Sequence, residues 1–83
     1  MPYPVRLAAA EKLRAEAVKA GEKLVAAAQS QRDKLVAEAA KKGALAKLAA
    51  QAAGDKLVTE AEKQAAELTA EAEKQIEKLT AKK

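Results

Sequence analysis

An eleven-residue repeat constrains this chain more than any other feature. From Glu11 the sequence divides into EKLRAEAVKAG, EKLVAAAQSQR, DKLVAEAAKKG, ALAKLAAQAAG, DKLVTEAEKQA, AELTAEAEKQI and a partial EKLTAKK. Eleven residues fill three helical turns at about 3.67 residues per turn, slightly more than the roughly 3.6 of a straight α-helix. A stripe of side chains with this spacing stays on one side of a helix and drifts gently right-handed. The repeat predicts an all-α chain that forms a right-handed or nearly straight hendecad coiled coil.

Four positions of the repeat form one apolar stripe. When the unit is lettered a to k with Glu11 at b, leucine recurs at d, valine at e, alanine at h, and small or apolar residues at a. At about 98° per residue these positions span roughly 100° of the helix surface, the width expected of a seam that a neighbouring helix covers. The predicted oligomer seam consists of Ala10, Leu13, Ala17, Gly21, Leu24, Val25, Ala28, Leu35, Val36, Ala39, Gly43, Ala46, Ala50, Gly54, Leu57, Val58, Ala61, Ala65, Leu68, Ala72, Ile76 and Leu79.

The three glycines allow two interpretations of the helix. Gly21, Gly43 and Gly54 all occupy position a, and the leucine phase continues past each of them. This predicts a single continuous helix over residues 6–83, preceded by a non-helical leader over residues 1–5. The glycines would then lie in close-packed layers, so that Gly43→Leu would disrupt assembly by overfilling one. The alternative is a helical hairpin that turns near Gly43 or Gly54, because a glycine after two lysines is also typical of a helix C-terminus.

The composition favours self-association. The 83 residues include no Cys, no His, no Phe and no Trp, so neither disulfides nor a zinc site of the usual kind can stabilise a small core. A long amphipathic helix has no interior of its own, so neighbouring helices must cover its stripe. We therefore expect a homo-oligomer, parallel and of three or four chains, although small-residue seams also suit antiparallel pairs and larger barrels.

Catalysis is not expected. The residues that most often act as acids, bases and nucleophiles, His and Cys, are missing, so the one serine, Ser30, has no histidine to activate it. The carboxylate pairs Glu67 with Glu71 and Glu73 with Glu77 have the spacing to hold a divalent cation, but they are expected to form a solvated acidic face. No catalytic, cofactor-binding or metal-binding residue is predicted.

Nucleic acid is not an expected partner. The net charge is +4 and the pI is about 9.4, but lysines alternate with glutamates and the chain has almost no aromatic residues for stacking. A membrane surface is a less favoured partner than the chain itself. An eleven-residue amphipathic repeat can lie on lipid as apolipoprotein-like helices do, but this apolar stripe is rich in Ala and Gly and lacks Trp and Phe.

The units DKLVAEAAKKG and DKLVTEAEKQA, with ALAKLAAQAAGDKL between them, resemble the hendecad tails of some bacterial cell-envelope proteins. The resemblance covers nearly all of residues 11–83 and implies a stalk, spacer or assembly segment in the cell envelope. More distantly, the chain is similar to group 3 late embryogenesis abundant proteins, which repeat Ala-Lys-Glu-rich 11-mers, stay largely disordered in water and protect against desiccation. Leu-Val pairs at 24–25, 35–36 and 57–58 depart from that pattern and favour a folded assembly.

The leading functional prediction is accordingly a non-catalytic homo-oligomerisation module. The alternative is a protective or membrane-surface amphipathic helix.

Overall fold

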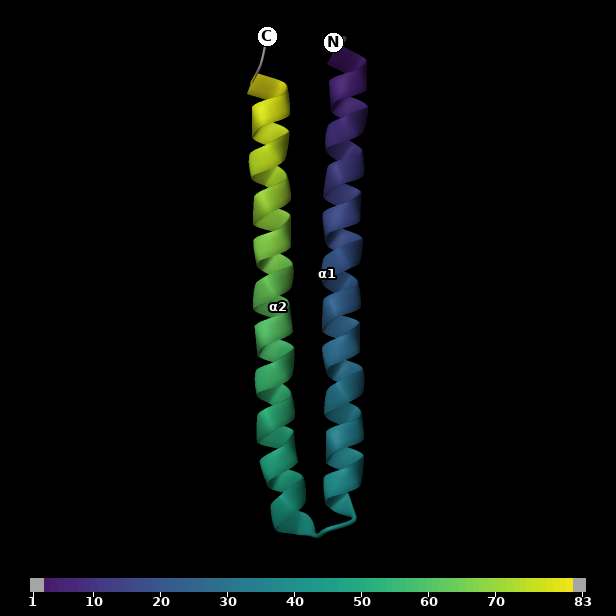
Figure 1. Ribbon diagram of the computed structural model, residues 1–83, viewed down its shortest axis with the longest axis vertical. Helices are drawn as coiled ribbons and strands as arrows, with labels where there is room; N and C mark the ends of the chain where they lie inside the picture. The colour runs from purple at the N-terminus through teal and green to yellow at the C-terminus, as the bar shows by residue number, and fades with distance from the viewer. Residues whose placement is uncertain (1–2, 82–83) are drawn as a thin grey trace.

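The computed structural model contains two long α-helices that pack against each other (Figure 1). It describes residues 3–81, and the side chains of residues 7–79. Helix α1 comprises Tyr3–Ala40 and helix α2 comprises Ala44–Ala81, so each has 38 residues. The helices run antiparallel, and the first turn of α1 lies at the same end as the last turn of α2, which we call the open end (Figure 1). The chain is an all-α helical hairpin.

The chain turns at residues 41–43, so it does not form the single continuous helix predicted over residues 6–83. The alternative prediction, a hairpin that turns near Gly43, describes the structure. The amides of residues 41–43 donate hydrogen bonds to the carbonyls three residues earlier, at 2.9 to 3.4 Å, which tightens the end of α1. The phase of the repeat could not reveal this break, because the three turn residues occupy positions j, k and a and the count of eleven continues across them.

Gly43 has a structural role different from the one we predicted. Its φ is 121°, a conformation that residues with an L side chain rarely adopt. A Cβ atom at Gly43 would have no other atom within 4 Å. The expectation that Gly43 lies in a close-packed layer is therefore wrong, and its requirement for glycine comes from the backbone.

Gly54, the other predicted turn position, lies inside α2. A Cβ atom at Gly54 would be 3.0 Å from the Cβ atom of Arg32, so the missing side chain leaves room for that arginine. A turn at Gly54 would instead place Arg32 opposite Ile76, counting equal numbers of residues from the turn. Because a charged group is costly to bury against an apolar side chain, the register with the turn at Gly43 is favoured.

The N-terminal boundary also differs from the prediction. Helix α1 begins at Tyr3, so residues 3–5 are helical where we expected a non-helical leader. The first four N–H groups of a helix have no partner within it, and Pro4 in the first turn therefore sacrifices no hydrogen bond. Residues 1–2, assigned to the leader, and residues 82–83, assigned to the helix, lie outside the described residues.

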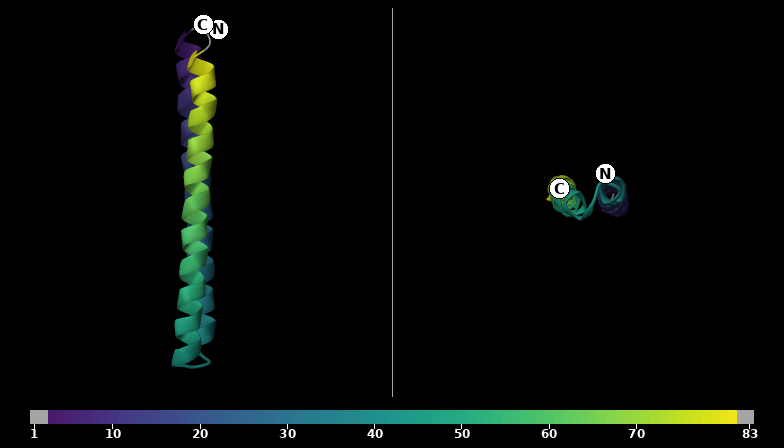
Figure 2. Two further views of the ribbon diagram at one scale, coloured as in Figure 1. Left: turned by 90° about the vertical axis from the view of Figure 1, so that its left-hand side faces the viewer. Right: turned by 90° about the horizontal axis from the view of Figure 1, so that it is seen from below.

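The hairpin is a thin rod. Its Cα atoms extend over 62 × 14 × 7 Å with a radius of gyration of 18.7 Å, compared with about 12 Å for a compact domain of this length. Seen edge-on, it is one layer of two helices (Figure 2). Within residues 7–79 the buried apolar side chains are those of Ala10, Ala28, Ala61 and Ile76, and no large side chain is fully buried. Each helix therefore buries only a narrow strip along the other helix, and both broad sides of the layer face solvent.

Candidate interaction surface

The interface between α1 and α2 is built on small residues at position a. A Cβ atom on Gly21 would lie 2.9 Å from the Cβ atom of Ala65, so these two positions face each other across the interface. One repeat farther from the turn, Ala10 and Ile76 are both buried. The two backbones approach closely because glycine and alanine have little or no side chain to keep them apart.

Arg32 also belongs to this interface, although it is not among the predicted seam residues. It lies eleven residues after Gly21, at position a, and its Cβ and Cγ atoms occupy the space beside Gly54. Its Nε atom is 3.2 Å from Oδ1 of Asp55. The aliphatic part of the side chain packs against the partner helix while the guanidinium reaches a solvent-exposed carboxylate. The eleven-residue spacing was the one signal in the sequence that could have identified it.

The predicted seam residues fall into three groups by burial. The predicted residues at positions a and h other than Gly43, together with the valines at e, are buried or half-buried: Ala10, Ala17, Gly21, Val25, Ala28, Val36, Ala39, Ala50, Gly54, Val58, Ala61, Ala65, Ala72 and Ile76. Three residues at position d are half-buried: Leu13, Ala46 and Leu79. The remaining five are exposed: Leu24, Leu35, Gly43, Leu57 and Leu68.

Four of these exposed residues form a surface that we call the leucine face. The exposed fractions of Leu24, Leu35, Leu57 and Leu68 are 37%, 44%, 39% and 38%. Leu24 and Leu57 line one open groove of about 270 Å³ together with two interface alanines, and Leu24 and Leu68 line a second groove. Leucines of α1 and α2 therefore lie on the same side of the layer.

The antiparallel arrangement explains why the leucines share a side. With position a facing the partner helix, position d lies about 65° to one side and position i about 65° to the other. A half-turn about an axis perpendicular to the layer exchanges the two antiparallel helices and keeps each side of the layer in place. Position d of both helices therefore projects to one side, and position i of both helices projects to the opposite side.

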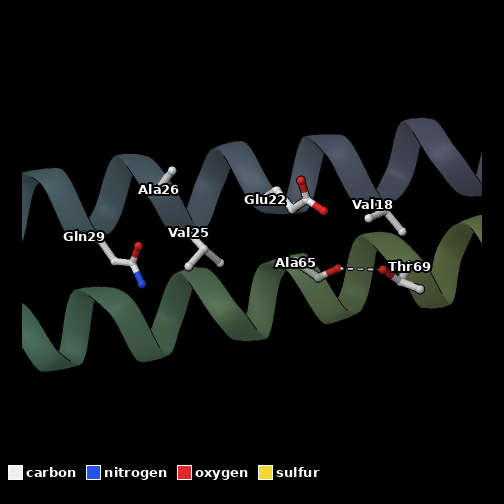
Figure 3. Close-up of a pocket in the computed structure, with 8 residues that line it drawn as sticks. Val18, Glu22, Val25, Ala26, Gln29, Ala65 and Thr69 are labelled. Atoms are coloured by element: carbon white, nitrogen blue, oxygen red, sulfur yellow. Dashed lines mark hydrogen bonds between the residues drawn. The ribbon is translucent and has the colours of Figure 1, made fainter.

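The side opposite the leucine face contains a different groove, of about 350 Å³ (Figure 3). Val18, Val25 and Ala65 supply its apolar lining. Glu22 also lines it, and Figure 3 shows Val25 pointing towards α2. The hydroxyl of Thr69 donates a hydrogen bond of 3.2 Å to the carbonyl of Ala65 on its own helix. Since that hydroxyl is satisfied locally, it does not need a partner in the groove.

Ion pairs join the helices on this opposite side, which we call the polar side. Near the open end, Nε of Arg14 donates a hydrogen bond of 2.7 Å to Oε1 of Glu73. This hydrogen bond is the main cause that lowers the pKa of Glu73 below its ordinary value; desolvation opposes it, and the positive charge of Arg14 adds to the lowering. The same contact raises the pKa of Arg14. Nearer the turn, Arg32 and Asp55 form the second cross-helix pair.

Of the two carboxylate pairs considered for a cation, the one that includes Glu73 is already engaged with Arg14. Among the residues the structure describes, no three side chains of His, Cys, Asp or Glu come together as a metal site would require. Over the same part of the chain, neither helix has a stretch long and apolar enough to cross a membrane.

Comparison of the chain with protein-family models, with curated proteins and with solved structures gives no match. The leucine face is the candidate interaction surface, because contiguous exposed apolar side chains mark sites of contact with a partner.

Proposed function

We propose that the chain is a non-catalytic structural module in which two hairpins pack their leucine faces together and form a rod-shaped spacer or assembly segment. One observation carries this proposal: Leu24, Leu35, Leu57 and Leu68, from both helices, are exposed on the same side of a two-helix layer. Packing two such sides together would place these leucines at the centre of a four-helix bundle, the usual solution for helices with one apolar stripe each.

The exposed area of the hairpin supports association. The chain exposes 6303 Å², whereas a compact monomer of 8.7 kDa exposes about 4,700 Å². The hairpin thus exposes about 1,600 Å² more than a compact protein of its mass. A protein interface of standard size covers about 800 Å² on each partner. The rod therefore has ample surface for such an interface.

The proposed assembly contains two chains rather than the three or four parallel chains expected from the sequence. Positions a and h are already covered within the chain, so a second chain has mainly position d left to cover. Lys41, Lys42 and Lys47 lie at or beside the turn, and residues 39–54 include no Asp or Glu. Because like charges repel, we place the two turns at opposite ends of the rod. A right-handed or nearly straight hendecad supercoil remains part of the proposal.

Sedimentation equilibrium tests this assembly. The parent chain should sediment at twice its mass of 8.7 kDa, and Leu24→Gln/Leu57→Gln should sediment at the mass of one chain. Leu45→Gln/Leu48→Gln is the matched control, because it makes the same chemical change at exposed leucines outside the leucine face. The control should remain dimeric, and circular dichroism should show helix in every variant compared.

Three results would contradict the proposal. The first is a parent chain that retains its helix content at the mass of one chain over a wide range of concentration. The second is a Leu24→Gln/Leu57→Gln variant that dimerises as tightly as the parent. The third is loss of the dimer in the control, which would place the contact at the turn instead of along the leucine face.

A further inference from the structure

The first two turns of α2 present a second apolar surface, away from the leucine face. Leu45 is 83% exposed and Leu48 is 62% exposed, more than any leucine of the leucine face. Ala46 and Ala50 of the same segment are half-buried, and Leu48 lies about 200° around the helix from both. The two leucines therefore project away from α1, and Ala49 and Ala52 beside them are also exposed. We call Leu45, Leu48, Ala49 and Ala52 the tip surface.

Positive charge surrounds the tip surface. Lys41 and Lys42 precede it, Lys47 lies in the same two turns of α2, and residues 39–54 include no acid. The nearest preceding carboxylate, Glu38, is 3.7 Å from Lys41, with about three quarters of each side chain exposed, so this contact leaves the lysine accessible. The first turn of α2 has no acidic residue.

We propose that the tip surface docks on a membrane surface that contains anionic phospholipid, so that the turn end of the rod contacts the lipid and the open end does not. The two leucines project from one helix at the end of a 62 Å rod, with no second helix on that side. A bilayer can accept them at the boundary of its acyl chains while its phosphates bind the surrounding ammonium groups, the two contributions that hold interfacial helices on lipid. The lysines with no acid between them select a negative surface over a neutral one. This contact uses none of the leucine-face residues, so it stands or falls independently of the proposed dimer.

Co-sedimentation of the full chain with vesicles tests the docking. The chain should bind vesicles of phosphatidylcholine mixed with phosphatidylglycerol, should not bind pure phosphatidylcholine vesicles, and should be released as salt is raised. Lys41→Gln/Lys42→Gln should weaken binding roughly thirty-fold, at about five-fold for each lysine near an anionic surface. Lys12→Gln/Lys78→Gln makes the same change in net charge at the open end and should leave binding unchanged. Leu45→Gln/Leu48→Gln should weaken binding at least roughly ten-fold.

Tryptophan reporters test whether the turn end alone contacts the lipid. The chain has no tryptophan, so Leu45→Trp and Leu7→Trp each give a single fluorophore, one at the tip surface and one at the exposed open end. Leu45→Trp should shift to the blue on anionic vesicles and be quenched by brominated lipid, while Leu7→Trp should do neither. A shift at both positions would mean that the rod lies flat on lipid and would overturn the proposal. Equal binding by the parent and the tip variants would overturn it as well. So would a parent chain that does not bind anionic vesicles, and an acidic protein would then be the occupant to test.

Discussion

Gly21, Gly43 and Gly54 occupy the same position of the repeat, yet each is glycine for a different physical reason. Gly21 allows close approach, because a Cβ atom there would lie 2.9 Å from that of Ala65. Gly54 leaves space for the side chain of an arginine on the other helix. A Cβ atom at Gly43 would have no neighbour within 4 Å, and glycine is favoured there by the positive φ. A substitution at each glycine should therefore destabilise the hairpin for a different reason, and a different second change should restore its stability.

Gly43→Ala should destabilise the hairpin by about 1–3 kcal/mol, the usual cost of a strained backbone conformation. D-alanine at position 43, introduced by chemical synthesis, should cost nothing, because its favoured φ has the opposite sign. Urea unfolding followed by circular dichroism at a fixed concentration measures both. If L- and D-alanine destabilise equally, crowding and not φ would be the cause.

Gly21→Ala should lower the free energy of unfolding by up to about 2 kcal/mol, because the clash with Ala65 outweighs the gain of about 1 kcal/mol in helix propensity. In the exchanged pair Gly21→Ala/Ala65→Gly, the methyl group moves to the other helix. Its stability should return to within about 1 kcal/mol of the parent. Strictly additive single effects in this double-mutant cycle would show that the two positions do not touch.

For the helices, the sequence predicted the apolar stripe, but it did not predict which positions of the stripe would lie between α1 and α2. The eleven-residue period placed positions a and h in the predicted seam, and most of these residues are buried or half-buried between the two helices of one chain. It could not reveal that the partner helix belongs to the same chain, since the turn keeps the phase of the repeat. Once a lies at the centre of the interface, position d lies to its side, and this is why Leu24 and Leu57 are exposed instead of buried. Arg32 was missed because only its spacing, and not its residue type, indicates an interface.

The ion pair at the open end should make the docking of α1 on α2 depend on pH. Because Arg14 lowers the pKa of Glu73 in the folded state, the stabilisation is present at neutral pH and is lost as the pH falls through that lowered pKa. Glu73→Gln should therefore lower the melting temperature slightly at neutral pH and make no difference in strong acid. Glu62→Gln, the same change one repeat nearer the turn and away from Arg14, is the matched control for the loss of one carboxylate. If the melting temperatures of Glu73→Gln and the parent still differ in strong acid, the ion pair with Arg14 is not the cause of the difference.

For the whole molecule, the turn at Gly43 determines both the length of the rod and the area that it exposes to solvent. It folds two 38-residue helices into a layer 62 Å long, and it leaves one side apolar and the other joined by ion pairs. The assembly and membrane-docking proposals both depend on this shape, because a continuous helix would have neither a leucine face nor a tip.

A distance measured between α1 and α2 distinguishes the hairpin directly from a continuous helix. The chain has no cysteine, so spin labels can be placed at Glu11→Cys and Lys74→Cys, two exposed positions near the open end. Electron double resonance should give a distance within about 30 Å, since packed helix axes lie about 8–10 Å apart and the labels add to this. A continuous helix would separate these residues by about 95 Å. Dilution with unlabelled chain removes distances between chains, and a long distance after dilution would reject the hairpin.

The central turn also limits how a protein built this way can evolve in length. Duplication of one unit in a single arm would leave about 16 Å of helix without a partner and would change which residues meet across the interface. Matched duplications, one on each arm at equal distance from Gly43, would lengthen the rod and preserve every older pairing. Descendants of such a sequence should therefore gain or lose eleven-residue units in pairs, one in each helix, so that the turn stays at the middle of the chain.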